Sequence, residues 1–151
     1  MYEYKAIVTN VVDGDTVDVD IDLGFGVWIR DERIRLMGID TAETRTSNAT
    51  EKSWGIAAKD LVTSLTGSNK SVIIKTEKDK SGKYGRILGT IELVLDGKTV
   101  NLNELLVEEK LAVPYLGGNR DDNREAFGIW EYWSIDYDEY LAQKALQESG
   151  E

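Results

Sequence analysis

The stretch Arg33-Ile34-Arg35-Leu36-Met37-Gly38-Ile39-Asp40-Thr41-Ala42-Glu43 decides both the fold and the candidate site. Its alternation predicts a strand with Ile34 and Leu36 facing the core. Arg35 then points to the other side, toward a groove or a buried anion site. An ion pair with a strand neighbour such as Asp18 or Asp20 is the alternative. The strand ends in Asp40, Thr41 and Glu43, which form either an ordinary polar loop or a functional site.

Two further motifs favour the functional site. Upstream lies a second acidic turn, Val12-Asp13-Gly14-Asp15-Thr16-Val17, and downstream lies Lys83-Tyr84-Gly85-Arg86. Carboxylates from two strand ends can hold a hard cation such as calcium. Two arginines can grip a phosphate between them. Together the three motifs predict a metal-dependent phosphodiesterase.

The composition limits the chemistry further. The 151 residues predict one domain, 1–151, and they include no cysteine and no histidine. Disulfides, catalytic triads with histidine and ordinary zinc sites are thereby excluded. Acid–base and metal chemistry must use Asp, Glu, Tyr, Lys or Arg, which favours oxygen-seeking cations. With no membrane-spanning run and no signal-peptide pattern, a cytoplasmic location is expected unless a leader was trimmed.

The net charge of −10 is unusual for a nucleic-acid-binding protein, but it is unevenly distributed. Residues 120–151 carry nine acidic and three basic side chains, whereas residues 68–86 carry six basic and two acidic ones. A locally basic face can still bind phosphates. We expect such binding to be weak and strongly dependent on salt.

Periodicity and turn residues predict an α+β fold: a five-stranded OB-type β-barrel with about three helices. The barrel and its helices occupy 1–116, and an acidic, aromatic helical tail occupies 119–148. The strands are expected at 4–12, 15–23, 27–39, 71–77 and 87–95. The helices are expected from a capping box at Asn48 to about 66, at 102–111 and at roughly 120–147.

The tail helix carries an apolar stripe of Phe127, Trp130, Trp133, Tyr137 and Leu141. Such a stripe is more often core or a docking surface than a platform for stacking nucleotides. Three placements are open for the tail: against the barrel, over part of the groove, or in a homodimer contact through 120–147.

In order and spacing, the motifs resemble those of the staphylococcal nuclease (thermonuclease) family over roughly residues 5–116. The matching residues run from the Asp13-Gly14-Asp15 turn through 35–43, Asp79, 83–86, 96–101 and 111–112. The resemblance implies a calcium ion held by the carboxylates of Asp15 and Asp40 and by the carbonyl of Thr41.

The resemblance also implies the remaining roles. Glu43 would be the general base, and Arg35 and Arg86 would bind the scissile phosphate. Lys83 and Tyr84 would contact a neighbouring phosphate, and Tyr115 would line the nucleotide pocket. The implied reaction is hydrolysis of single-stranded DNA or RNA to products ending in 3′-phosphate.

This chain departs from the family pattern in several places. Ala42 stands where the family usually has proline, and the connector with the Gly24-Phe25-Gly26 turn is longer. The Tyr115 segment aligns only with a gap, and the tail after Gly118 has no counterpart. Two alternatives to a nuclease stay open: a catalytically degenerate interaction module for nucleic acid or protein, and a structural calcium-binding protein.

Overall fold

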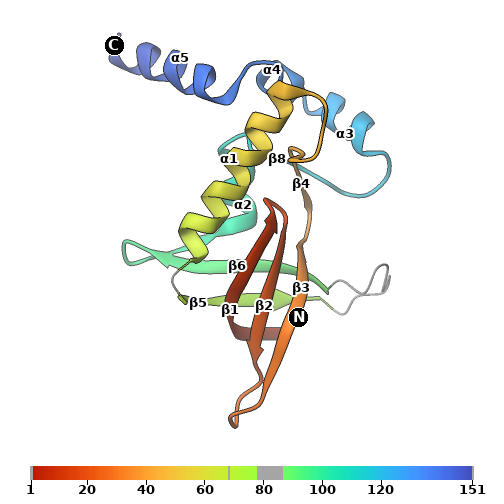
Figure 1. Ribbon diagram of the computed structural model, residues 1–151, viewed down its shortest axis with the longest axis vertical. Coiled ribbons are helices and arrows are strands. Elements are labelled where there is room, and N and C mark those ends of the chain that lie inside the picture. The colour runs from red at the N-terminus through yellow and green to blue at the C-terminus, as the bar shows by residue number, and fades with distance from the viewer. Residues whose placement is uncertain (1, 68, 78–86, 151) are drawn as a thin grey trace.

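The computed structural model describes residues 2–67, 69–77 and 87–150. Five of its strands close into a barrel (Figure 1). Neighbouring strands follow the order β3-β2-β1-β5-β6, and a parallel pairing of β3 with β6 completes the ring. This arrangement confirms the predicted α+β fold with an OB-type barrel. The barrel strands are β1 (Tyr2–Asp13), β2 (Thr16–Asp22), β3 (Trp28–Leu36), β5 (Ser71–Thr76) and β6 (Ile87–Leu95).

The alternation in β2 explains how this strand faces two environments. Val17, Val19 and Ile21 are buried in the barrel core, as their spacing predicts. Two of the intervening aspartates pair with arginines of β3: Asp18 lies 2.8 Å from Arg33 and Asp20 lies 2.9 Å from Arg30. These cross-strand pairs help fix the register of the two strands.

The predicted strand 27–39 is two strands. After β3 the chain turns at Gly38, whose φ of 78° is in the left-handed region that glycine adopts without strain. It resumes as β4 (Ile39–Thr41), which pairs with β8 (Ala112–Pro114) in a separate two-stranded sheet. The turn lifts Asp40 and Thr41 out of the barrel and toward the helices.

Five helices are present in the described part of the chain, rather than about three. The helix α1 (Ala49–Thr66) begins where predicted, with the Asn48 side chain accepting a hydrogen bond from the Glu51 backbone N–H. A hairpin through β7 (Lys98–Asn101) leads into α2 (Leu102–Glu108). The tail forms α3 (Arg120–Ala126), α4 (Trp130–Trp133) and α5 (Tyr137–Ser149), which lie across the end of the molecule opposite the β2–β3 turn (Figure 1).

The predicted helical stretch at roughly 120–147 is helical but divided into three helices. Gly128 has a φ of 64°, which ends the first helical segment, and the side chain of Asp136 caps a new helix. Because the breaks change the direction of the chain, Phe127 and Leu141 are exposed rather than part of a continuous apolar stripe.

The tail docks on its own chain through aromatic side chains. Trp133 is fully buried, and its indole N–H donates to the carbonyl of Lys110 at 2.8 Å. Trp54 of α1 is also fully buried and donates to the carbonyl of Ile135 at 2.8 Å. Because Trp133 is buried within the chain and Trp130 packs against the core, the structure does not support the predicted homodimer through these two tryptophans.

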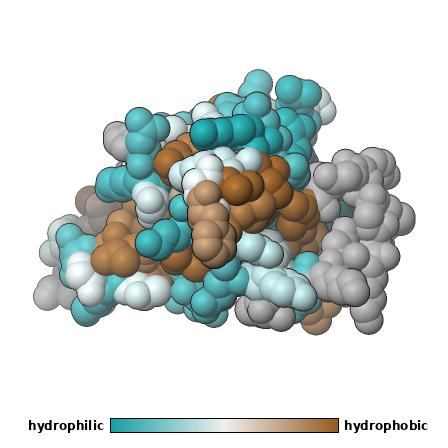
Figure 2. All heavy atoms as spheres, turned by 90° about the horizontal axis from the view of Figure 1, so that it is seen from below, coloured by the Kyte–Doolittle hydropathy of each residue, from teal (hydrophilic) through white to brown (hydrophobic). Residues whose placement is uncertain are grey.

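Apolar side chains also gather on the face that carries the β2–β3 turn (Figure 2). Phe25 lies fully exposed in this turn, and Leu23, Val27 and Ile29 beside it are more than a third exposed. In the described residues, no helix is long and apolar enough to span a bilayer.

Candidate active site

Five segments of the described chain meet at a cleft of about 540 Å³ beneath α3. They are the β1–β2 turn, the β3–β4 segment with the loop after it, Leu88 of β6, the chain after β8, and the first residue of α3. The side chains at this cleft are strongly charged. Its polar lining comprises Asp13, Asp15, Thr16, Arg35, Thr41, Glu43, Tyr115 and Arg120.

Packing of the β1–β2 turn against α1 positions Asp15. A Cβ added at Gly14 would lie 2.6 Å from the Cβ of Ala58, so only glycine allows this approach. One Asp15 oxygen accepts from the Thr16 hydroxyl at 3.1 Å, and the other accepts from the Thr41 backbone N–H at 3.3 Å. These bonds bring the Asp15 carboxylate next to β4, as the sequence motifs imply.

Arg35 lies on the wall of the cleft. Its neighbours Ile34 and Leu36 are buried in the core, so the parity of β3 was predicted correctly. The guanidinium donates to the carbonyls of Leu36 at 3.1 Å and Ile39 at 3.0 Å. Its ion-pair partner is Asp15, at 3.1 Å, rather than a carboxylate of the outer face of β2.

The loop after β4 places Glu43 at the cleft. Its backbone N–H donates to the buried Glu51 carboxylate at 2.9 Å. The helix α1 supports this loop at Gly55. A Cβ added to Gly55 would lie only 2.3 Å from the Glu43 carbonyl oxygen, so glycine is needed for the close approach. The side chain of Glu43 is 37% exposed and faces the cleft. Ala42 donates its backbone N–H to the carbonyl of Leu111 at 3.2 Å, a bond that proline could not donate.

Two arginines of α3, Arg120 and Arg124, were missed by the sequence reasoning. Arg124 is buried, and its Nε donates to Asp40 at 2.8 Å. Its other nitrogens contact Glu51 at 3.2 Å and the Thr41 carbonyl at 3.1 Å. The guanidinium also lies 5.1 Å from the ring centre of Trp133, within the range of a cation–π interaction.

Arg120 covers Asp40 from the side of the cleft. It donates to one oxygen of Asp40 through Nε at 3.2 Å and Nη2 at 2.9 Å, and it also contacts the carboxylate of Glu43. Its side chain is about half exposed. Partial burial works against the charged form, but the charges of Asp40 and Glu43 outweigh it and raise the pKa of Arg120 above its ordinary value.

A faint sequence signal existed for these two residues. They are the first two of only three basic residues in an otherwise acidic tail, and four positions separate them. Residues four apart share one face of a helix, so both would reach the same acidic partner. Glu51 was missed for another reason: it was interpreted as half of a capping box, yet its carboxylate points inward to Arg124 and Glu43.

The observed donor set does not fit a calcium ion as it stands. Asp40 is fully buried, and both of its oxygens accept hydrogen bonds from arginines. The Thr41 carbonyl, the third expected ligand, accepts from Arg124. Among the described side chains, no group of three or more carboxylates is arranged to hold a metal. In this arrangement, guanidinium groups neutralise the negative charge of the carboxylates that would be the calcium ligands.

The remaining predicted residues fall into two groups. Tyr115 lines the cleft, with its hydroxyl donating to the Gly118 carbonyl at 2.8 Å. Lys83, Tyr84 and Arg86, like Asp79, lie outside the described residues. The structure therefore brings together Asp15, Arg35, Thr41, Glu43 and Tyr115 at the cleft, with Asp40 directly behind them.

Comparison with known proteins agrees with this geometry. The family model described as "Staphylococcal nuclease homologue" matches residues 33–132, about two thirds of the chain. The chain belongs to the staphylococcal nuclease family. The match covers the acidic segment after β3, extends through α3 and ends within α4.

Similar individual proteins include two thermonucleases. The chain is 36% identical over 87 residues to a thermonuclease of Staphylococcus intermedius, covering 58% of this chain and 48% of that protein. It is 35% identical over 109 residues to a thermonuclease of Staphylococcus hyicus, covering 72% and 57%. An uncharacterized protein of Methanocaldococcus jannaschii is 31% identical over 159 aligned positions, covering 87% and 73%. The chain spans about half of the length of the thermonucleases that it matches.

Proposed function

We propose that this chain is a nuclease that hydrolyses phosphodiester bonds in single-stranded DNA or RNA. The observation that carries the proposal is the presence of Arg35, Glu43 and Asp15 in one open cleft. Family membership supports the same conclusion, because two of the three named relatives are thermonucleases. Calcium dependence and products ending in 3′-phosphate belong to the proposal through the family resemblance.

Arg35 would bind the phosphate under attack. Its guanidinium is anchored to two backbone carbonyls and is only 17% exposed, so it is held in place before substrate arrives. A planar guanidinium can donate to two phosphate oxygens at once. Since negative charge grows on these oxygens in the transition state, a fixed positive group stabilises that state more than the ground state. Arg86 would join it from outside the described residues.

Glu43 would activate the attacking water. In a chain without histidine, a carboxylate at the cleft is a suitable general base. The backbone of Glu43 is fixed by Glu51 and by the close approach of Gly55. For Glu43 to accept a proton from water, its carboxylate must turn from Arg120 toward the substrate. Tyr115, on the same cleft, would contact the nucleotide.

Cleavage assays with labelled single-stranded DNA and RNA test this proposal. We expect the parent protein to degrade at least one substrate when calcium is present and to stop when a chelator is added. Arg35→Gln and Glu43→Gln should each slow the reaction about 10²–10³-fold. Arg33→Gln is the matched control, because Arg33 lies on the same strand but pairs with Asp18 on the outer face.

Three results would count against the proposal. Cleavage by Arg35→Gln and Glu43→Gln at the rate of the parent would remove the assigned roles. Cleavage that continues unchanged after chelation would remove the calcium requirement. Binding of single-stranded DNA with no cleavage under any condition would favour the degenerate interaction module instead.

A further inference from the structure

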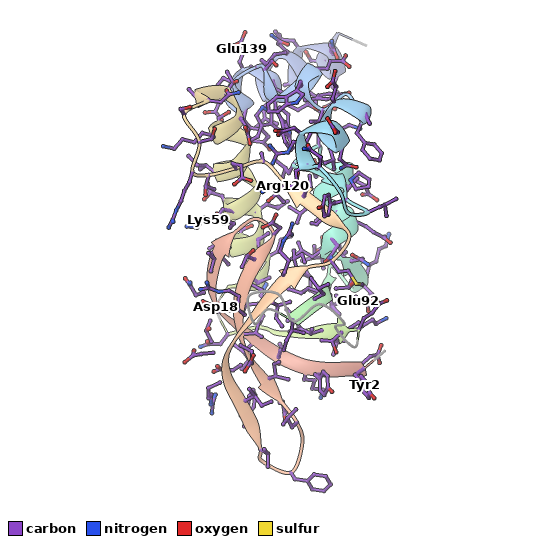
Figure 3. The ribbon with its side chains drawn as sticks, turned by 90° about the vertical axis from the view of Figure 1, so that its right-hand side faces the viewer. Tyr2, Asp18, Lys59, Glu92, Arg120 and Glu139 are labelled. Carbon is purple, nitrogen blue, oxygen red and sulfur yellow. The ribbon has the colours of Figure 1, made fainter. Side chains whose placement is uncertain are left out.

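Arg120 brings a second guanidinium group into the cleft from the tail of the chain. As the first residue of α3, it points from the helix toward β4 (Figure 3) and lines the cleft together with Arg35. Its side chain is 49% exposed, compared with 17% for that of Arg35. Among the described residues that line the cleft, these two arginines are the only basic ones. A strand that enters the cleft would therefore find its more accessible positive charge at Arg120.

The charge of the cleft depends on Arg120. The described lining carries three acidic side chains, those of Asp13, Asp15 and Glu43, against two arginines, which gives a formal charge of −1. Without Arg120 the lining would carry a charge of −2, and its repulsion of a phosphodiester would increase. Arg120 thus provides the positive charge that lets an anionic strand approach the acidic side chains.

Arg120 can change partners without leaving an unpaired charge in the interior. It donates to Asp40 and contacts the carboxylate of Glu43. Arg124 is only 5% exposed and donates to Asp40 at 2.8 Å, so Asp40 keeps a buried partner when Arg120 moves. Arg124 also lies 3.5 Å from the Glu43 carboxylate, but it is not part of the described lining of the cleft. Of the two arginines, Arg120 is therefore the one that can turn toward a ligand.

A phosphodiester offers Arg120 the same kind of partner as the Glu43 carboxylate. Both groups present two oxygens that share a negative charge, and a planar guanidinium can donate to two such oxygens at once. In the described part of the chain, no group accepts a hydrogen bond from Nη1 of Arg120. Because Glu43 lines the same cleft, a phosphate bound there can replace it as the partner of Arg120.

We propose that Arg120 binds a phosphate of the nucleic-acid strand and gives up its contact with Glu43 to do so. The inference rests on the proposed function, because the strand is the substrate assigned there. Binding of the strand then releases the carboxylate of Glu43, the proposed general base, toward the attacking water. Arg120 is a substrate-binding residue from the tail, in addition to the phosphate contacts proposed for Arg35 and Arg86.

Fluorescence anisotropy with a labelled single-stranded oligodeoxythymidylate tests the proposal on the full chain, with chelator present so that calcium-dependent cleavage does not consume the probe. We expect Arg120→Ala to bind about tenfold more weakly than the parent at low salt, because one charge-assisted contact to phosphate is lost. The slope of log K against log salt concentration should become shallower by about 0.7, the value for one phosphate contact on a single strand. Arg30→Ala is the matched control: it removes the same charge from an arginine that pairs with Asp20 on the outer face, and both values should stay close to those of the parent.

A second substitution tests the exchange of partners. Glu43→Gln removes the competing carboxylate, so the oligonucleotide should bind more tightly when Arg120 is present. In the Arg120→Ala background the same substitution should give a smaller gain, because only the general repulsion between Glu43 and phosphate is removed. Equal gains in the two backgrounds would mean that Arg120 and Glu43 act independently, and would overturn the exchange.

The outcomes separate this inference from the proposed function. A folded Arg120→Ala variant that binds like the parent would overturn the inference, and so would weaker binding with an unchanged salt slope or a parent that does not bind at low salt. Circular dichroism checks folding, and Arg120→Gln replaces the alanine variant if the latter does not fold. A parent that binds through Arg120 but cleaves neither DNA nor RNA would end the proposed function and leave phosphate binding by Arg120 standing.

Discussion

Replacing Arg124 with methionine should destabilise the protein severely. The guanidinium is 5% exposed, and it pairs with Asp40 at 0% and Glu51 at 6% side-chain exposure. Methionine fills a similar volume but leaves both carboxylates short of their buried partner. Breaking a buried ion pair by removing one member costs about 3–5 kcal/mol. A domain of this size has a free energy of unfolding of about 5–15 kcal/mol, so the loss is a large share of it.

Urea denaturation followed by tryptophan fluorescence measures this loss of free energy, since Trp133 packs against the guanidinium. In a separate thermal denaturation, the melting temperature should fall by about 6–20 °C, at roughly 2–4 °C per kcal/mol. Arg120→Met is the matched control on the same helix face. Because its side chain is half exposed, its ion pairs should contribute less than about 1 kcal/mol. Adding Asp40→Asn to Arg124→Met should restore part of the lost stability by removing one uncompensated charge.

Similar losses of stability in Arg124→Met and Arg120→Met would contradict a structural role for the buried pair. A loss of less than about 1 kcal/mol in Arg124→Met would also contradict it, because removing the cation of a buried network leaves its carboxylates uncompensated. Either result would mean that groups other than Arg124 neutralise the charge of the Asp40 carboxylate.

Three smaller perturbations test other parts of the structure. Gly55→Ala should displace the Glu43 loop, because the added Cβ would lie 2.3 Å from the Glu43 carbonyl oxygen. Limited proteolysis should then cut this loop faster than in the parent. An unchanged rate of proteolysis would contradict the close packing at Gly55. Asn103→Ala should lower the free energy of unfolding by about 1–3 kcal/mol, because the Ile91 N–H and the Met37 carbonyl lose their hydrogen-bond partner. Urea denaturation measures this loss, and an unchanged free energy would argue against the role. Arg33 lowers the pKa of Asp18 below its ordinary value of 3.8, so the pair stabilises the fold above that pH, and the effect fades as the pH falls through the folded-state pKa. The difference in urea midpoint between the parent and Arg33→Gln should therefore be present at neutral pH and shrink as the pH falls below 3.8, and a constant difference would exclude this linkage.

Local patterns in the sequence determined the barrel and part of the site. Alternation separated Arg35 from Ile34 and Leu36, because a strand places successive side chains on opposite faces. The helix start at Asn48 was likewise predicted, since a helix cap depends on a few neighbouring residues. The roles of Lys83, Tyr84 and Arg86 stay predictions, because they lie outside the described residues.

Only the tertiary structure decided which charges meet at Asp40. Arg124 lies 84 residues after its partner Asp40, and no period or spacing links positions so far apart. The pairing arises because Gly128 breaks the tail helix and Trp133 anchors the next segment, which together set α3 over β4. The sequence thus determined the acidic segments and Arg35, since strand and turn preferences act over a few residues, but it did not identify Arg120, Arg124 or Glu51. Packing decided that a guanidinium, rather than solvent, covers Asp40, because burial of the tail's aromatic side chains fixes where α3 lies.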